Sequence, residues 1–139
     1  MNILRFIIPK SSVEFVEKTS TVRQALEKMK FHRYVAIPVL DEEGMYVGTL
    51  RNDDLFKYFL EGGRYDYKSA EKDSVMDILD RDYQRALSHG ATLSDLVEGV
   101  KMHNFVPVTD DRGCFIGIVL RRDVLDFLFN SYQENKGDA

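Results

Sequence analysis

The stretch that decides the fold occurs twice: AIPVLDEEGMYVGTLRNDDLFKYF (Ala36–Phe59) and FVPVTDDRGCFIGIVLRRDVLDFL (Phe105–Leu128). A shift of 69 positions places the first copy on the second without a gap. The identical pairs are Pro38/Pro107, Val39/Val108, Asp41/Asp110, Gly44/Gly113, Gly48/Gly117 and Asp54/Asp123. A duplication of this kind builds one compact object from two similar halves, and the groove between such halves is a natural place for a ligand. We therefore expect function at repeat-equivalent positions.

The residues before each copy predict a capped helix. Thr21 is followed three places on by Gln24, and Thr92 by Asp95, which is the spacing of a capping box. Apolar residues then recur at helical spacing, as Val22, Ala25, Leu26 and Met29 and as Leu93, Leu96, Val97 and Val100.

Each copy predicts two strands, an acidic turn and a closing helix, because branched and aromatic runs are interrupted by Asp and Gly. The predicted ranges are Val35–Leu40, Tyr46–Leu50 and Asp54–Leu60 in the first half, and Phe105–Thr109, Phe115–Leu120 and Asp123–Asn130 in the second. With one strand before each capped helix, the order in each half is β-α-β-β-α. The predicted fold class is α+β, with an α/β sandwich-like arrangement.

The chain divides into two repeats with a connector and a tail. We expect repeat 1 at residues 8–60, a connector at 61–73, repeat 2 at 74–130 and a flexible tail at 131–139. The connector contains Gly62-Gly63, and a short helix is expected around Ser69–Lys72. Repeat 1 carries two extra residues between His32 and Pro38, so the two grooves are not expected to be identical.

Composition excludes several classes of protein. The 139 residues are 44% hydrophobic and 30% charged, which is typical of a globular protein, and no apolar run reaches the length of a membrane span. A net charge of −4 argues against a generic nucleic-acid binder. Cys114 alone forms no intramolecular disulfide, and His32, His89 and His103 lack the spacing of metal ligands. We expect a cytoplasmic protein without a membrane segment or a metal site.

A repeat of about 60 residues with this element order, an apolar residue before Pro, and Gly followed six places later by Asp resembles the cystathionine β-synthase (CBS) domain. Two such repeats in tandem resemble a CBS pair, or Bateman module. The resemblance covers residues 8–129. It implies a stand-alone CBS-pair protein of bacterial type, with pseudo-two-fold symmetry between its halves.

The family's nucleotide-binding signature is Gly, two mostly apolar residues, Ser or Thr, two variable residues, and Asp. It corresponds here to Gly48–Asp54 and Gly117–Asp123, with Arg51 and Leu120 at the hydroxyl position. The resemblance implies that Asp54 and Asp123 accept hydrogen bonds from ribose hydroxyls. A carboxylate at a helix start can accept two hydrogen bonds from a diol, but Asp there is also an ordinary helix cap. Both interpretations stay open.

Other candidate ligand contacts flank these signatures. Ile37-Pro38 and Val106-Pro107 match the family's apolar-Pro motif, which lines the base pocket, although each Pro also favours a sheet edge or a strand start. Cations that could meet a phosphate are Arg51, Arg121 and Arg122, with Lys10 and Arg33 as weaker candidates.

We expect a non-catalytic regulatory module, because no nucleophile with a base, phosphate loop or metal cluster is apparent. The implied ligand is an adenine nucleotide (AMP, ADP or ATP), S-adenosylmethionine or a cyclic dinucleotide, and no other cofactor is required. The alternatives are a ligand-free dimerisation or protein-interaction module and a small unrecognised enzyme. The expected partners are an unidentified regulated protein and a second copy of the chain. The faces expected in that homodimer are Leu55, Phe56 and Phe59, and Val124, Leu128 and Phe129.

Overall fold

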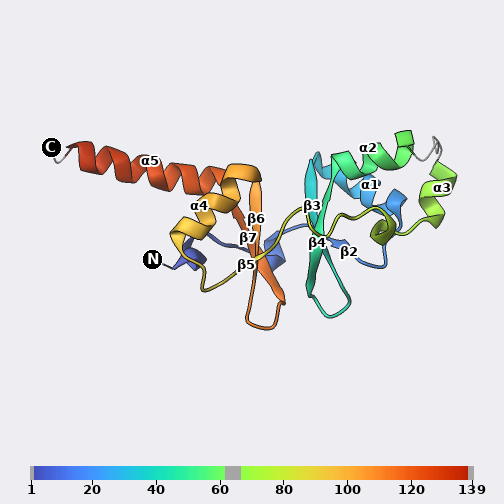
Figure 1. Ribbon diagram of the computed structural model, residues 1–139, viewed down its shortest axis with the longest axis horizontal. Coiled ribbons are helices and arrows are strands. Elements are labelled where there is room, and N and C mark those ends of the chain that lie inside the picture. The colour runs from blue at the N-terminus through green and yellow to red at the C-terminus, as the bar shows by residue number, and fades with distance from the viewer. Residues whose placement is uncertain (1, 62–66, 138–139) are drawn as a thin grey trace. The chain divides into compact units, whose positions relative to one another are not determined.

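The computed structural model describes residues 2–61 and 67–137, so Gly62-Gly63 of the expected connector lie outside the described residues (Figure 1). The chain forms two compact units. Residues 14–85 make the first-repeat unit, and residues 1–13 with 86–139 make the second-repeat unit. Both contain strands and helices in the order β-α-β-β-α, which confirms the α+β class and the tandem repeat.

The first-repeat unit is a three-stranded sheet with helices. Its elements are β2 (Val16–Glu17), α1 (Val22–His32), β3 (Ala36–Leu40), β4 (Tyr46–Arg51), α2 (Asn52–Glu61), α3 (Tyr67–Lys72) and the short 3₁₀ helix η3 (Val75–Asp77). The strand order is β2-β3-β4, with β2 parallel and β4 antiparallel to β3. The predicted capping box opens α1: Gln24 N donates to Thr21 Oγ1 at 3.2 Å, and Thr21 N donates to Gln24 Oε1 at 2.9 Å.

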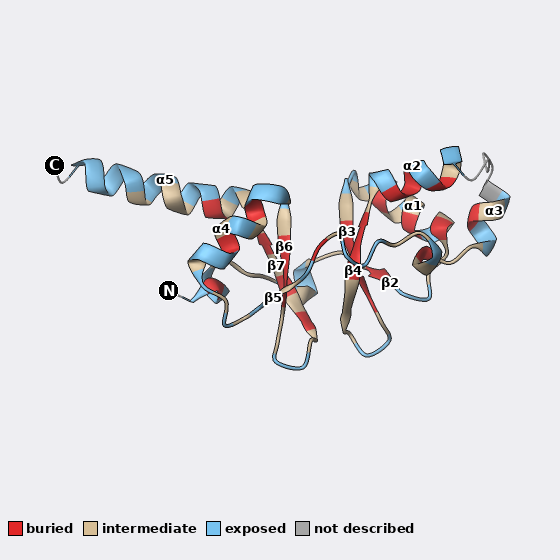
Figure 2. Cartoon of the chain, viewed as in Figure 1, coloured by how far each residue is buried: buried red, intermediate tan, exposed pale blue. Residues whose placement is uncertain are grey.

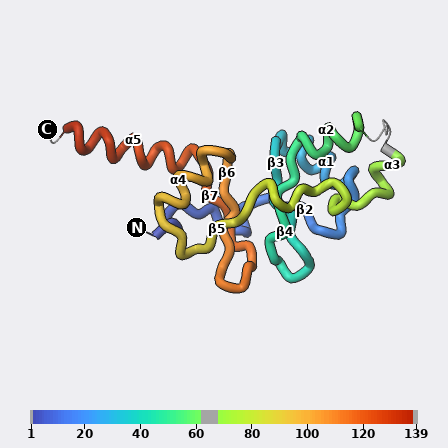
Figure 3. The backbone as a smooth tube through the Cα atoms, in the orientation of Figure 1, coloured from blue at the N-terminus to red at the C-terminus, as the bar shows by residue number. Residues whose placement is uncertain are grey.

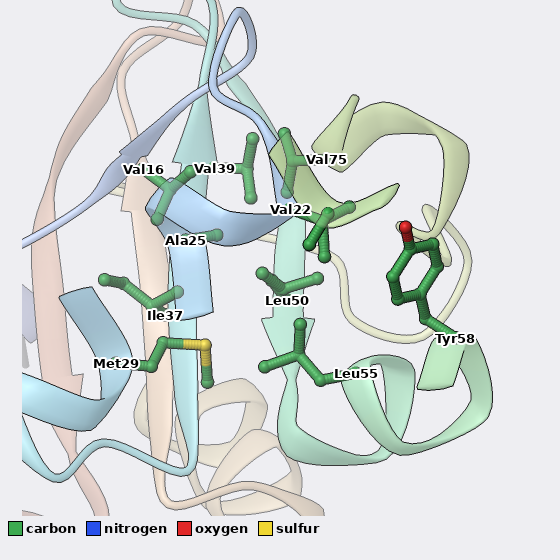
Figure 4. Close-up of a cluster of buried hydrophobic side chains, with 11 residues drawn as sticks. Val16, Val22, Ala25, Met29, Ile37, Val39, Leu50, Leu55, Tyr58 and Val75 are labelled. Atoms are coloured by element: carbon green, nitrogen blue, oxygen red, sulfur yellow. The ribbon is translucent and has the colours of Figure 1, made fainter. Parts of the chain in front are cut away.

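The core of this unit lies between the sheet and the helices (Figure 4). Its fully buried members are Val16, Val22, Ala25, Met29, Ile37, Val39, Leu50, Ala70 and Val75, joined by Leu55 and Tyr58. The Tyr58 hydroxyl points away from the aliphatic side chains and donates to Asp73 Oδ2 at 2.7 Å. This hydrogen bond satisfies the polar tip of an otherwise buried ring.

The second-repeat unit repeats the plan with one more strand. Its elements are η1 (Ile3–Phe6), β1 (Ile8–Pro9), η2 (Lys10–Ser12), β5 (Leu87–Ser88), α4 (Leu93–Met102), β6 (Phe105–Thr109), β7 (Phe115–Leu120) and α5 (Arg121–Gly137). The strand order is β1-β7-β6-β5. The predicted capping box is present at α4, where hydrogen bonds from Thr92 hold the pKa of the Asp95 carboxyl below its usual range.

The first residues of each predicted repeat belong to the unit of the other repeat. The N-terminal strand β1 pairs with β7, Ile8 opposite Ile118, and the N-terminal trace can be followed to β7 in Figure 3. The segment 74–85, with which the predicted second repeat begins, belongs to the first-repeat unit. A Cβ on Gly117 would overlap the Ile8 carbonyl oxygen, and a Cβ on Gly48 would lie 3.2 Å from the Leu79 side chain. The absence of a side chain at Gly117 therefore leaves space for the N-terminal segment, and its absence at Gly48 leaves space for the segment 74–85.

Three expectations need correction. Helix α5 continues through residues 131–137, where a flexible tail was expected, and these residues contain no Pro that would end the helix. Pro38 and Pro107 lie in the central strands β3 and β6 rather than at edges. The pairing with β2 begins at Val39, and the pairing with β5 begins at Val108. Each proline comes one residue earlier, so its lack of an N–H removes no hydrogen bond to these two strands.

The third correction concerns the apolar faces expected in a dimer. Leu55 and Val124 are core residues, and Phe59 and Leu128 pack against the cores. Phe56 and Phe129 are exposed, as expected, and Figure 2 shows how much of α5 is exposed. Adjacent residues such as Leu55 and Phe56 point to different sides of a helix, so one is buried while the next is exposed.

Candidate functional site

Each candidate site is the junction between the last strand of a repeat and its closing helix. In the first-repeat unit, β4 ends at Arg51 and Asp54 is the third residue of α2. In the second-repeat unit, β7 ends at Leu120 and Asp123 is the third residue of α5. The two carboxylates thus occupy equivalent backbone positions in their own units.

The Asp54 carboxylate is occupied on both oxygens by Arg51. The backbone N–H of Arg51 donates to Oδ2 at 2.9 Å, and Nη2 of the same residue donates to Oδ1 at 3.0 Å. Only 4% of the Asp54 side chain is exposed. The first contact is the helix-cap interaction that the sequence left open for this position.

Arg51 is itself held by the segment that follows η3. Its guanidinium carbon lies 3.7 Å from the centroid of the Tyr83 ring, which is cation–π geometry. Asp80 Oδ2 lies 3.9 Å from Nη2. The guanidinium is therefore enclosed by two carboxylates and an aromatic face, and its immediate surroundings are not those of a phosphate site.

The Asp123 carboxylate is open by comparison. Its side chain is 38% exposed, and Leu120 replaces the arginine that occupies Asp54. Within residues 2–61 and 67–137, its one charged contact is Arg122 Nε at 3.9 Å, and no hydrogen bond to its oxygens is present. This carboxylate keeps its capacity to accept hydrogen bonds.

Arg121 points toward the preceding helix. Its Nε donates to the carbonyl oxygen of Val100 at 2.7 Å, and its backbone N–H donates to Asn104 O at 2.8 Å. Val100 lies in the last turn of α4, where carbonyl groups lack helical partners. Of the two arginines predicted to stand beside Asp123, Arg122 has a charged contact with it, while Arg121 closes a helix end.

The apolar-Pro motifs divide between core and opposite face. The side chains of Ile37 and Val106 are buried in the two hydrophobic cores. Because successive strand residues point to opposite faces, Pro38 and Pro107 face away from those cores. In the ladders, Pro38 lies opposite Thr49 and Pro107 opposite Ile118. Ile37 and Val106 can therefore offer a ligand only their backbone groups.

A polar cluster that the sequence reading missed lies on β4. Tyr46 and Thr49 share a hydrogen bond of 2.6 Å between their hydroxyl oxygens, and the Tyr46 hydroxyl also donates to Gln84 O at 3.3 Å. Burial raises the pKa of Tyr46 to about 12. The repeat-equivalent residues are Phe115 and Ile118, so the loss of apolar character in one repeat was the available signal.

The weaker candidates have local roles. Lys10 lies in η2, and Arg33 ends α1 in the left-handed conformation, with φ 60°. His89 Nε2 lies 3.1 Å from Asp111 Oδ1, and His32 stacks on Tyr34. No group of three His, Cys, Asp or Glu residues suited to a metal ion occurs in the described part of the chain. Over the same residues, no helix has the length and apolar character needed to span a membrane.

Several known proteins resemble this chain. It is 23% identical over 133 residues to the uncharacterized protein MJ1225 of Methanocaldococcus jannaschii, a match that covers 87% of this chain and 47% of that protein. The chain thus spans about half the length of this curated relative.

Solved structures share the fold. The CbpB protein of Listeria monocytogenes, solved in complex with c-di-AMP, has a TM-score of 0.83 and 26% identity, covering 94% of this chain and 97% of that one. CBSX2, solved in complex with AMP, has a TM-score of 0.72 and 21% identity, covering 94% and 98%. The CBS domain model matches residues 7–61 and 73–130. The chain belongs to the CBS domain family.

Proposed function

We propose that the protein is a non-catalytic regulatory module that binds an adenine-containing nucleotide. Its family membership supports a regulatory role. Two proteins with the same fold were solved with adenine nucleotides, c-di-AMP in CbpB and AMP in CBSX2. The ligand changes the conformation of the module, which a partner protein reads.

The open carboxylate of Asp123 is the observation that carries this proposal. Its two oxygens can accept hydrogen bonds from the 2′- and 3′-hydroxyls of a ribose, and such charge-assisted bonds are the strong ones. Arg122, beside it, brings a cation to the same helix start. Phosphate oxygens are well matched to a guanidinium. Backbone groups of Val106 and the ring of Pro107 contact the base.

A thermal-shift panel tests the proposal directly. AMP, ADP, ATP, S-adenosylmethionine and c-di-AMP are compared with GMP as the control for the base and 2′-deoxy-AMP as the control for the diol. A ligand at about 100 times its dissociation constant adds roughly 2.7 kcal/mol to the free energy of unfolding. We expect AMP to stabilise more than 2′-deoxy-AMP. No shift with any adenine compound would favour the ligand-free interaction module.

We further propose that the protein pairs with a second copy of itself. Exposed apolar residues recur at equivalent positions of the two repeats: Phe31 and Met102, Phe56 and Leu125, Leu60 and Phe129. Exposed apolar side chains that gather into a large patch mark interaction surfaces. Light scattering at tens of micromolar is expected to give twice the 16.1 kDa chain mass, and Phe129→Asp to lower it.

A further inference from the structure

We propose that Arg51 is a built-in occupant of the Asp54 carboxylate, and that it restricts nucleotide binding to Asp123. The inference rests on the proposed function, because it concerns which of two equivalent carboxylates takes the ribose. It makes Arg51 the residue that sets the number of ligands per chain at one.

The first step is the occupancy of the two carboxylate oxygens. A diol would need the oxygens that already accept from Arg51 N at 2.9 Å and Arg51 Nη2 at 3.0 Å. The backbone donor is fixed by the start of α2, so only the guanidinium could leave. With 4% of the Asp54 side chain exposed, a ribose has no access to it while Arg51 stays in place.

The second step is that Arg51 is anchored from the other side. Tyr83 stacks on the guanidinium, and Asp80 adds a second negative charge at 3.9 Å. Displacing the arginine would therefore expose two carboxylates to the incoming nucleotide, whose phosphate is also negative. Repulsion between these carboxylates and the phosphate would disfavour nucleotide binding at Asp54.

The third step is the residue at the equivalent position in the other repeat. Leu120 stands at the position of Arg51, and its side chain has no group that can donate to Asp123. The carboxylate there is 38% exposed. The exchange of arginine for leucine thus removes the side-chain donor that covers the carboxylate in the first repeat.

Calorimetric titration with AMP tests the inference through reciprocal substitutions. The wild-type protein should bind one AMP per chain. Arg51→Thr should bind two, and Leu120→Arg should weaken the Asp123 site at least tenfold. The matched controls are Arg112→Thr, at an exposed arginine in a turn, and Leu120→Met, which introduces no charge. Both should leave the number of AMP molecules bound per chain and the AMP affinity unchanged. Arg51→Met, which keeps the aliphatic stem against Tyr83, replaces Arg51→Thr if that variant does not fold.

Hydrogen exchange without nucleotide separates this inference from the proposed function. Loss of the Arg51 contacts should speed amide exchange in residues 78–85 at least tenfold in Arg51→Thr, but not in Arg112→Thr. Two AMP molecules bound per wild-type chain would leave the proposed function standing and overturn the inference. No binding of AMP, ADP, ATP, S-adenosylmethionine or c-di-AMP by any variant would reject the proposed function. Arg51 would then be only a structural lock, and its role in site selection would be overturned as well.

Discussion

The two closing junctions, β4–α2 and β7–α5, have equivalent backbones and opposite side-chain chemistry. At the first, Arg51 bonds both oxygens of Asp54 and stacks on Tyr83. At the second, Arg121 is turned back to the Val100 carbonyl and Asp123 stays open. A repeated motif therefore need not repeat its function. The contacts of the two equivalent carboxylates differ with the residue three places before each, Arg51 or Leu120.

Replacing the two aspartates should separate their roles most clearly. Asp54→Ala leaves the largely buried guanidinium of Arg51 without its closest carboxylate, and breaking such a pair is strongly destabilising. We expect a loss of about 3 kcal/mol in the free energy of unfolding. Asp123→Ala removes an exposed carboxylate with one long contact and should cost less than about 1 kcal/mol. Urea denaturation of both variants measures the difference, and equal losses would contradict the comparison.

The signature glycines offer the next contrast. Gly117→Ala would push a Cβ into the Ile8 backbone at φ 157°, so β1 must move, and overpacking of this kind costs about 2 kcal/mol. Gly48→Ala would meet only the flexible Leu79 side chain and should cost less than about 1 kcal/mol. Thermal unfolding measures both, and hydrogen exchange of residues 3–12 reports whether β1 is released. A costlier Gly48→Ala would mean that the segment 74–85 is the more rigid cover.

Much of the fold follows from local signals in the sequence. The capping boxes at Thr21 and Thr92 and the β-α-β-β-α order depend on short-range spacing, and the structure confirms them. The exchange of the opening segments of the two repeats could not be predicted in this way. Strands as short as β1, with two residues, carry no periodicity, and their pairing is decided by distant partners.

The positions of the candidate sites could be predicted from the sequence, but the side-chain contacts of their carboxylates could not. The register of the duplication places Asp54 and Asp123 at equivalent helix starts, as the structure has them. The directions of Arg51 and Arg121 depend on which acceptor a long side chain finds in three dimensions. Tyr83 and the Val100 carbonyl are distant in sequence from the arginines that they hold, so no spacing rule could assign them.

The open carboxylate should also dominate ligand binding. If Asp123 accepts the ribose hydroxyls, Asp123→Ala loses at least one charge-assisted hydrogen bond, worth about 1.5 kcal/mol at an exposed site. We expect AMP affinity to fall about tenfold, which corresponds to about 1.4 kcal/mol. Asp123→Asn, which keeps the shape without the charge, is the matched variant. Calorimetric titration measures both, and an unchanged affinity in Asp123→Ala would place the ligand elsewhere.

The helix ends before the two junctions give the smallest contrast. Arg33 N donates to Lys30 O and Tyr34 N to Met29 O, so α1 closes on a left-handed residue, whereas α4 relies on the Arg121 side chain. A left-handed conformation with φ 60° disfavours Arg and suits Gly. Glycine relieves the strain of this conformation but also makes the unfolded chain more flexible, which offsets part of the gain. We expect Arg33→Gly to raise the free energy of unfolding by about 0.5 kcal/mol. His103→Gly, at the end of α4 where the backbone is extended at φ −138°, should destabilise instead. Paired urea denaturation decides it, because a gain at His103 or a loss at Arg33 would show that the two helices do not end by different means.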